Sequence, residues 1–81
     1  MENRIAAVSV IVEEPESVEA LNGILHDYSA CVIGRMGIPY RETGVNVICL
    51  VLEAPTDTVN ALTGKLGRLQ GVNARAVCSQ K

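Results

Sequence analysis

The run VEEPESVEALNGIL over residues 12–25 decides the fold, because LEAPTDTVNALTGKL over residues 52–66 repeats it within the same chain. Pro15 and Pro55 lie 40 residues apart, and the pattern V-x-A-L-x-G-x-L follows each of them. Each copy comes directly after an aliphatic, β-branched run of strand length. The repeated unit therefore predicts a strand, a helix that opens at a proline, and a second strand. Two such units in one chain predict a split βαβ domain.

The predicted elements follow the two units in order. Strands are expected over residues 5–12, 31–38, 45–52 and 72–78. Helices are expected to open at Pro15 and Pro55, since a proline in the first turn loses no hydrogen bond. The first helix is expected to end near Ser29, and residues 39–44 are expected to form a hairpin loop. The fold class is α+β, a ferredoxin-like βαββαβ sandwich with a four-stranded antiparallel sheet and two helices on one face.

The strands over residues 5–12 and 45–52 are apolar on both faces, which is typical of central strands. In an open sheet with helices on one side only, the other face is normally polar. A chain of 81 residues has nothing left with which to cover a second apolar face. We therefore expect a homo-oligomer, a dimer or a tetramer, with a second subunit on that face or with edge strands paired between subunits. A monomer with a mildly apolar face is the alternative.

Composition narrows the class of protein. The 81 residues are expected to form a single domain, 1–81, whose core lacks Phe and Trp. A net charge of −2, with acids and bases mixed, argues against a nucleic-acid partner. The three cysteines are widely spaced and are expected to be buried structural thiols. No signal pattern and no apolar run of membrane-spanning length is present, so we expect a cytoplasmic protein that does not bind the membrane.

Residues able to carry chemistry are sparse. His26 is the single histidine and has no partners at ligand spacing, so we expect a surface or helix-end residue. A functional pair of His26 with Cys31 is the alternative. No nucleotide-binding loop and no cysteine cluster is present, so no catalytic residue, cofactor or metal is expected. Gly23 and Gly64 occupy equivalent places in the two repeats and are expected to face each other where the helices cross.

The run IGRMGIPYR over residues 33–41 has the most unusual composition in the chain. Arginine offers a planar donor fork for carboxylate or phosphate, and glycine allows close backbone approach. The candidate effector or interface site consists of Arg35, Met36, Gly37, Tyr40 and Arg41. The alternative is an edge strand that is protected by charge and by a turn.

The same run, together with ENRI over residues 2–5 and ALTGKLGRL over residues 61–69, resembles the iron-only hydrogenase system regulator family. The resemblance covers essentially the whole chain. It implies a ferredoxin-like domain similar to ACT domains and to the C-terminal domain of the nickel-responsive repressor. Those domains associate through their sheets and bind small effectors at subunit interfaces. The nickel site of the repressor uses several histidines with a cysteine, so the single His26 does not carry it over, and no DNA-binding domain is expected here.

These observations predict a non-enzymatic, ACT-like regulatory domain linked by resemblance to an iron-only hydrogenase system. We expect it to bind a small-molecule effector or a protein partner at an interface that includes Arg35, Tyr40 and Arg41. The rival is a small oligomeric enzyme with a pocket between subunits, in which Tyr40, His26 and the cysteines are the candidates. An RNA-binding domain would need aromatic residues on the central strands, which contain none.

Overall fold

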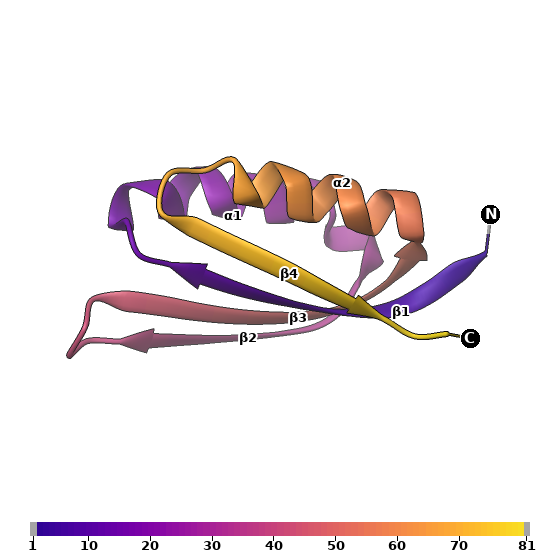
Figure 1. The fold of residues 1–81 in the computed structure, drawn as a ribbon, viewed down its shortest axis with the longest axis horizontal. Helices are drawn as coiled ribbons and strands as arrows, with labels where there is room; N and C mark the ends of the chain where they lie inside the picture. Colours follow the sequence, from indigo (N-terminus) through magenta and orange to yellow (C-terminus); the bar gives the residue numbers. More distant parts are fainter. Residues whose placement is uncertain (1, 81) are drawn as a thin grey trace.

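The computed structural model describes residues 2–80, which fold into one antiparallel sheet covered on one face by two helices. The elements are β1 (Asn3–Val12), α1 (Val18–Asp27), β2 (Val32–Tyr40), β3 (Val45–Pro55), α2 (Thr56–Gly67) and β4 (Val72–Cys78). Short 3₁₀ turns at Pro15–Ser17 and Ser29–Cys31 lead into and out of α1. The strand order is β2-β3-β1-β4, and both helices lie on the same side of it (Figure 1). The predicted fold class is confirmed, as is the central place of the strands that begin the two repeats.

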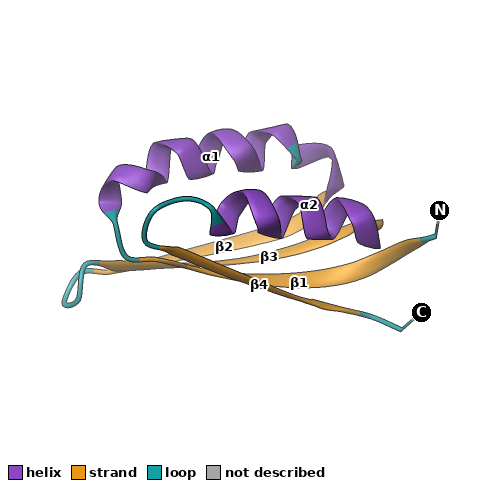
Figure 2. Cartoon of the chain, turned by 45° about the horizontal axis from the view of Figure 1, so that its top comes forward, coloured by secondary structure: helices purple, strands orange, loops and turns teal. Residues whose placement is uncertain are grey.

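The core lies between the sheet and the helices (Figure 2). Strand residues alternate between the two faces, so the even-numbered residues of β1 and β3 turn toward the helices. Val8, Val10, Leu50 and Leu52 are at most 1% exposed. The helices complete the layer with leucines and a valine at helical spacing, namely Leu21, Leu25, Val59, Leu62 and Leu66. The fully buried side chains of this core are therefore all aliphatic, with Tyr28, Cys31 and Cys78 packed against them from its margin.

The β2–β3 hairpin is longer than the sequence predicted. The expectation that a loop begins at Pro39 is wrong, because β2 continues through Pro39 and Tyr40, which pair with Asn46 and Val45. Proline is tolerated here because β2 is an edge strand and needs no donor on its open side. The turn closes with a hydrogen bond from the Gly44 amide to the Tyr40 carbonyl at 3.0 Å.

Other element ends shift by a few residues. The first helix ends at Asp27 rather than near Ser29, because the chain tightens there into the 3₁₀ turn at Ser29–Cys31. Strand β3 runs on to Pro55, whose partner in the register is Asn3. Pro55 is therefore both the last residue of β3 and the N-cap residue of α2, and it does not lie inside the first turn of the helix.

The connections that enter α1 and leave α2 are tied together. The Glu13 amide donates a hydrogen bond to the Gly71 carbonyl at 2.7 Å, and the Ser17 hydroxyl donates one to the Gln70 carbonyl at 2.6 Å. Gly71 has a φ of 72°, which favours glycine. A Cβ atom at this position would also collide with Glu14. We call this set of contacts the connection clamp.

Gly23 and Gly64 do not face each other, so the packing role expected for them is wrong. An added Cβ at either position would meet no described atom within 4 Å, and both residues are exposed. Each glycine lies two residues after a buried leucine, about 200° around the helix, so it points to solvent. Across the two helices, the structure instead places the Lys65 ammonium 5.0 Å from the centre of the Tyr28 ring.

Replacement of these glycines by alanine should stabilise the domain. Gly23→Ala and Gly64→Ala are each expected to raise the free energy of unfolding by about 0.5–1 kcal/mol, since alanine restricts the unfolded chain and finds open space in the fold. Thermal and urea unfolding of the two variants and of the unmodified protein measures the change. A loss of stability in either variant would mean that its glycine packs against something.

Candidate functional site

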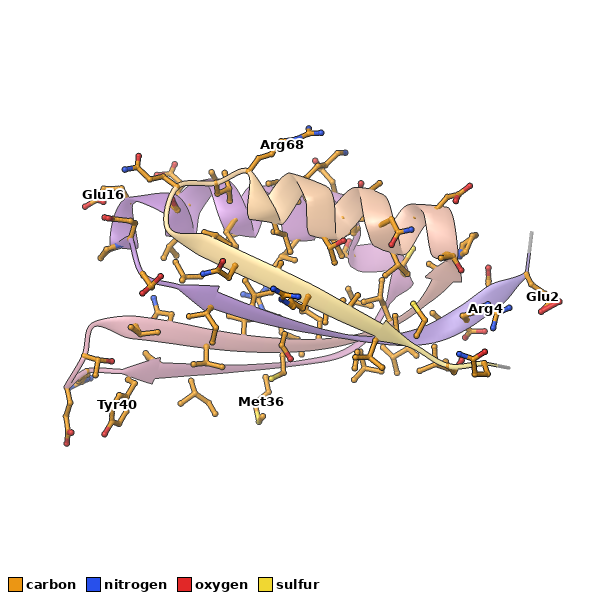
Figure 3. All side chains as sticks on the ribbon, viewed as in Figure 1. Glu2, Arg4, Glu16, Met36, Tyr40 and Arg68 are labelled. Carbon is orange, nitrogen blue, oxygen red and sulfur yellow. The ribbon has the colours of Figure 1, made fainter. Side chains whose placement is uncertain are left out.

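The five residues of the sequence-predicted site do not form one cluster. Met36 and Tyr40 point away from the helices (Figure 3). Arg35 lies on the helix side, where its Nη2 donates a hydrogen bond to the Asn22 Oδ1 at 3.0 Å, and Gly37 lines the same side. Arg41 is exposed in the hairpin turn. A contiguous run in an edge strand is divided in this way because successive residues face opposite sides.

Six large, exposed apolar side chains gather on the sheet face opposite the helices, which we call the outer face. They are Ile5, Met36, Ile38, Tyr40, Val51 and Val77, which are between 40% and 74% exposed. The register aligns Met36, Cys49, Ser9 and Arg75 in one row across the four strands. Among the described residues, Ile33 is the single further exposed large hydrophobic, so the apolar exposure is concentrated on this face. Patches of this kind mark interaction sites.

The outer face carries little charge. Glu53 and Arg75 are the charged residues that the register places on it within residues 2–80. At the hairpin end, the Tyr40 hydroxyl donates a hydrogen bond to the Glu42 carboxylate at 2.9 Å. That bond occupies the polar tip of Tyr40, a residue that is 49% exposed, and leaves its ring to the apolar face.

A second feature, the α1–β2 groove, lies on the helix side between α1 and the edge strand. It consists of two adjoining hollows of about 360 and 220 Å³ that share Asn22 and Arg35. The larger hollow is lined by Asn22, Leu25, His26, Ser29, Val32, Arg35 and Leu50. Leu25 and Leu50 form an apolar floor, while the other side chains at the rim are mostly polar and exposed.

Sequence reasoning missed the helix residues of this groove. Asn22, His26 and Ser29 recur at spacings of four and three residues, which places them on one face of a helix. This spacing could have been recognised in the sequence, but nothing there indicated that the Arg35 side chain would form a hydrogen bond with Asn22. His26 lies exposed in the last turn of α1, as expected for a surface or helix-end residue. Cys31 is not among the residues that line the larger hollow.

The cysteines are half-buried, so the expectation that they are buried is wrong. Cys31 and Cys78 pack against the core from a 3₁₀ turn and from the end of an edge strand. Cys49 lies in the row of Met36 on the outer face. All three are free thiols, and within residues 2–80 no three His, Cys, Asp or Glu side chains are grouped so as to hold a metal ion. None of the helices described is long and apolar enough to cross a membrane.

Comparison with solved structures shows that the chain has an ACT-like α+β fold. The ACT domain of GTP pyrophosphokinase from Chlorobium tepidum superposes with a TM-score of 0.65 at 18% identity, covering 100% of this chain and 91% of that one. A formyltetrahydrofolate deformylase from Pseudomonas putida superposes with a TM-score of 0.68 at 11% identity, covering 95% of this chain but 29% of the deformylase. At these identities the two likenesses establish the fold alone.

The family follows from closer matches. The family model described as "TM1266-like: Iron-only hydrogenase system regulator, putative" matches residues 4–76. The structure of the uncharacterized protein TM1266 from Thermotoga maritima superposes with a TM-score of 0.93 at 34% identity, covering 98% of this chain and 100% of that one. The chain therefore belongs to the TM1266-like family, and the resemblance seen in the sequence is confirmed. None of the curated proteins matches it.

Proposed function

We propose that this chain is a non-enzymatic regulatory domain of an iron-only hydrogenase system that acts as a homo-oligomer. Family membership and the ACT-like fold support the regulatory role. The observation that carries the oligomer is the apolar outer face, which no described segment of the chain covers. Copies of the chain associate through this face, and an effector binds on the helix side.

The size and charge of the outer face favour a second copy of this chain over a different protein as its partner. The molecule measures 40 × 19 × 17 Å, and four strands about 4.8 Å apart give the face a footprint of roughly 500 Å². This area is of the same order as the roughly 800 Å² that each partner buries in a stable protein interface. A two-fold axis brings the same patch of each protomer together. The outer face carries one acid and one base, so two copies of it can meet without a net repulsion between like charges.

The proposal divides the residues of the sequence-predicted site between two roles. Met36 and Tyr40 belong to the assembly interface, because their exposed side chains lie on the outer face. Arg35 and Gly37 belong to the α1–β2 groove. Arg41 lies in the hairpin turn and belongs neither to the assembly interface nor to the α1–β2 groove.

Charge placed at the centre of the outer face should break the assembly. Val51→Lys puts an ammonium group on central strand β3, where a partner protomer would have to remove it from water, at a cost that a single nearby carboxylate, Glu53, does not offset. The matched control is Ala61→Lys, which adds the same charge to an exposed position of α2. Native mass spectrometry of protein prepared without oxygen should show a dimer or tetramer for the unmodified chain and for Ala61→Lys, and a monomer for Val51→Lys.

Two results would contradict self-association through this face. If the unmodified chain is monomeric at tens of micromolar, the chain does not act as a homo-oligomer. A Val51→Lys variant that assembles as well as the Ala61→Lys control would move the interface elsewhere, with the edge strands β2 and β4 as the next candidates.

The rate at which each thiol is alkylated tests independently whether the outer face is covered. Cys49 lies on the outer face, whereas Cys31 and Cys78 pack against the core of their own protomer. In the assembly Cys49 should react with iodoacetamide more slowly than in the Val51→Lys variant. Cys31 and Cys78 should react at the same rate in both, and mass spectrometry of peptides distinguishes the three sites. Equal reactivity of Cys49 in the two proteins would count against a covered outer face.

A further inference from the structure

We propose that the α1–β2 groove binds a small organic carboxylate with a compact apolar body, and that Arg35 holds its carboxylate group. The inference deepens the proposed function by naming the chemical class of the effector. It rests on the charge, the burial and the shape of the groove within a single protomer.

Arg35 is positioned to bind an anion. Within residues 2–80, its side-chain hydrogen-bond partner is the neutral amide oxygen of Asn22, and no carboxylate pairs with it. A guanidinium carries five N–H donors, so this single bond to Nη2 orients the group and leaves donors for a ligand. The planar fork of arginine matches both oxygens of a carboxylate.

The rest of the groove specifies the body of the ligand. Leu25 and Leu50 are 4% and 1% exposed and give the larger hollow an apolar floor. Asn22, His26 and Ser29 stand at its rim and supply further polar groups. A volume of about 360 Å³ is at the lower end of the range for ligand pockets. The hollow therefore fits a small molecule with a charged end and a hydrocarbon end.

The charge of the groove favours a carboxylate over a phosphate. Arg35 is the one Lys or Arg residue that lines either hollow in the structure as described. Sites for phosphate dianions commonly gather several cations or a cluster of arginines. One guanidinium above an apolar floor neutralises one negative charge and accommodates carbon, so a monocarboxylate is the better match.

The groove is also connected to the outer face. Ile38 and Val47 line the smaller hollow, and the same two residues are paired neighbours of β2 and β3 on the outer face. A ligand that reaches this hollow therefore touches residues that a second protomer would contact. Occupation of the groove and assembly are then coupled, and each shifts the other by the same factor.

The test uses 4-methylpentanoate as the probe, with the neutral 4-methylpentanamide and inorganic phosphate as comparisons. Titrations of ¹⁵N-labelled protein should show saturable shifts for the amides of residues 22–35 and 46–50 with the carboxylate, and none with the amide. Arg35→Gln should weaken carboxylate binding by about ten- to a hundredfold, the usual worth of a charge-assisted hydrogen bond. Arg41→Gln, which removes an exposed arginine outside the groove, should bind as the unmodified chain does.

The outcomes separate this inference from the proposed function. Binding of phosphate but not carboxylate would overturn the ligand class, and equal binding by Arg35→Gln would overturn the role of Arg35. Absence of binding by an oligomeric chain would refute the groove alone. A monomeric chain that still binds the carboxylate through Arg35 would refute the assembly and leave the groove standing. Arg35 is exposed, so circular dichroism should show Arg35→Gln to be folded.

Discussion

Leu62→Ala should lower the free energy of unfolding by about 3 kcal/mol, within the range of about 2–5 kcal/mol for removing a buried leucine side chain. Leu62 is 0% exposed on the buried face of α2. The core around it contains no Phe or Trp, so short aliphatic side chains alone would have to close the cavity. In a domain of this size the loss corresponds to a fall in melting temperature of roughly 12–24 °C.

Ile33→Ala is the matched control for Leu62→Ala, because Ile33 is 60% exposed. It removes as many carbon atoms and should cost about 0.5 kcal/mol or less, as surface substitutions usually do. Both variants are compared by chemical and thermal unfolding at one protein concentration, since the proposed assembly would make the melting temperature depend on concentration. Similar losses in the two variants would show that α2 does not pack as the structure has it.

Gly71→Ala should lower the free energy of unfolding by about 2–3 kcal/mol. Two effects add at this position. The φ of 72° lies in the left-handed region, and a Cβ atom would meet the side chain and backbone nitrogen of Glu14. Relief of that collision would pull the Glu13 amide away from the Gly71 carbonyl and open the connection clamp.

Gly44 offers a control that isolates the collision. Its φ is 73°, almost the same as that of Gly71, but an added Cβ would meet no described atom within 4 Å. Gly44→Ala should therefore cost only the conformational part, about 1 kcal/mol. Urea unfolding of the two variants measures the difference, and equal losses would mean that the clamp contributes nothing beyond backbone conformation.

Much of the fold was predictable from the sequence because the repeat encodes it twice. Alternation in the strands identified both faces of β1 and β3, and the bounds predicted for β4 agree with those observed. Element ends were less accurate where tertiary pairing decides them. Pro39 reads as a loop residue in sequence, yet it remains in β2 because its neighbours pair with β3.

The candidate site was harder to predict because its parts come together only in three dimensions. The sequence singled out one strand but grouped Arg35 with Met36, although neighbouring residues of a strand face opposite sides of the sheet. The contact between Arg35 and Asn22 joins an edge strand to a helix and has no local signature. The glycine error had a similar origin, since equivalent places in two repeats indicate equivalent positions in two helices rather than contact between them.

The strand order also governs the sequence of events in folding. Central strand β1 lies between β3 and β4, so its hydrogen-bonding partners are residues 46–55 and 72–78. Within this domain β1 therefore precedes both of its partners along the chain, and its pairing is complete only when β4 has been made. Such distant contacts must overcome the entropy of loop closure before they contribute stability, which slows folding. Until the residues of β4 are available, one edge of β1 has no hydrogen-bonding partner. During that interval the open edge of β1 is exposed to pairing with a strand of another chain, which would lead to aggregation.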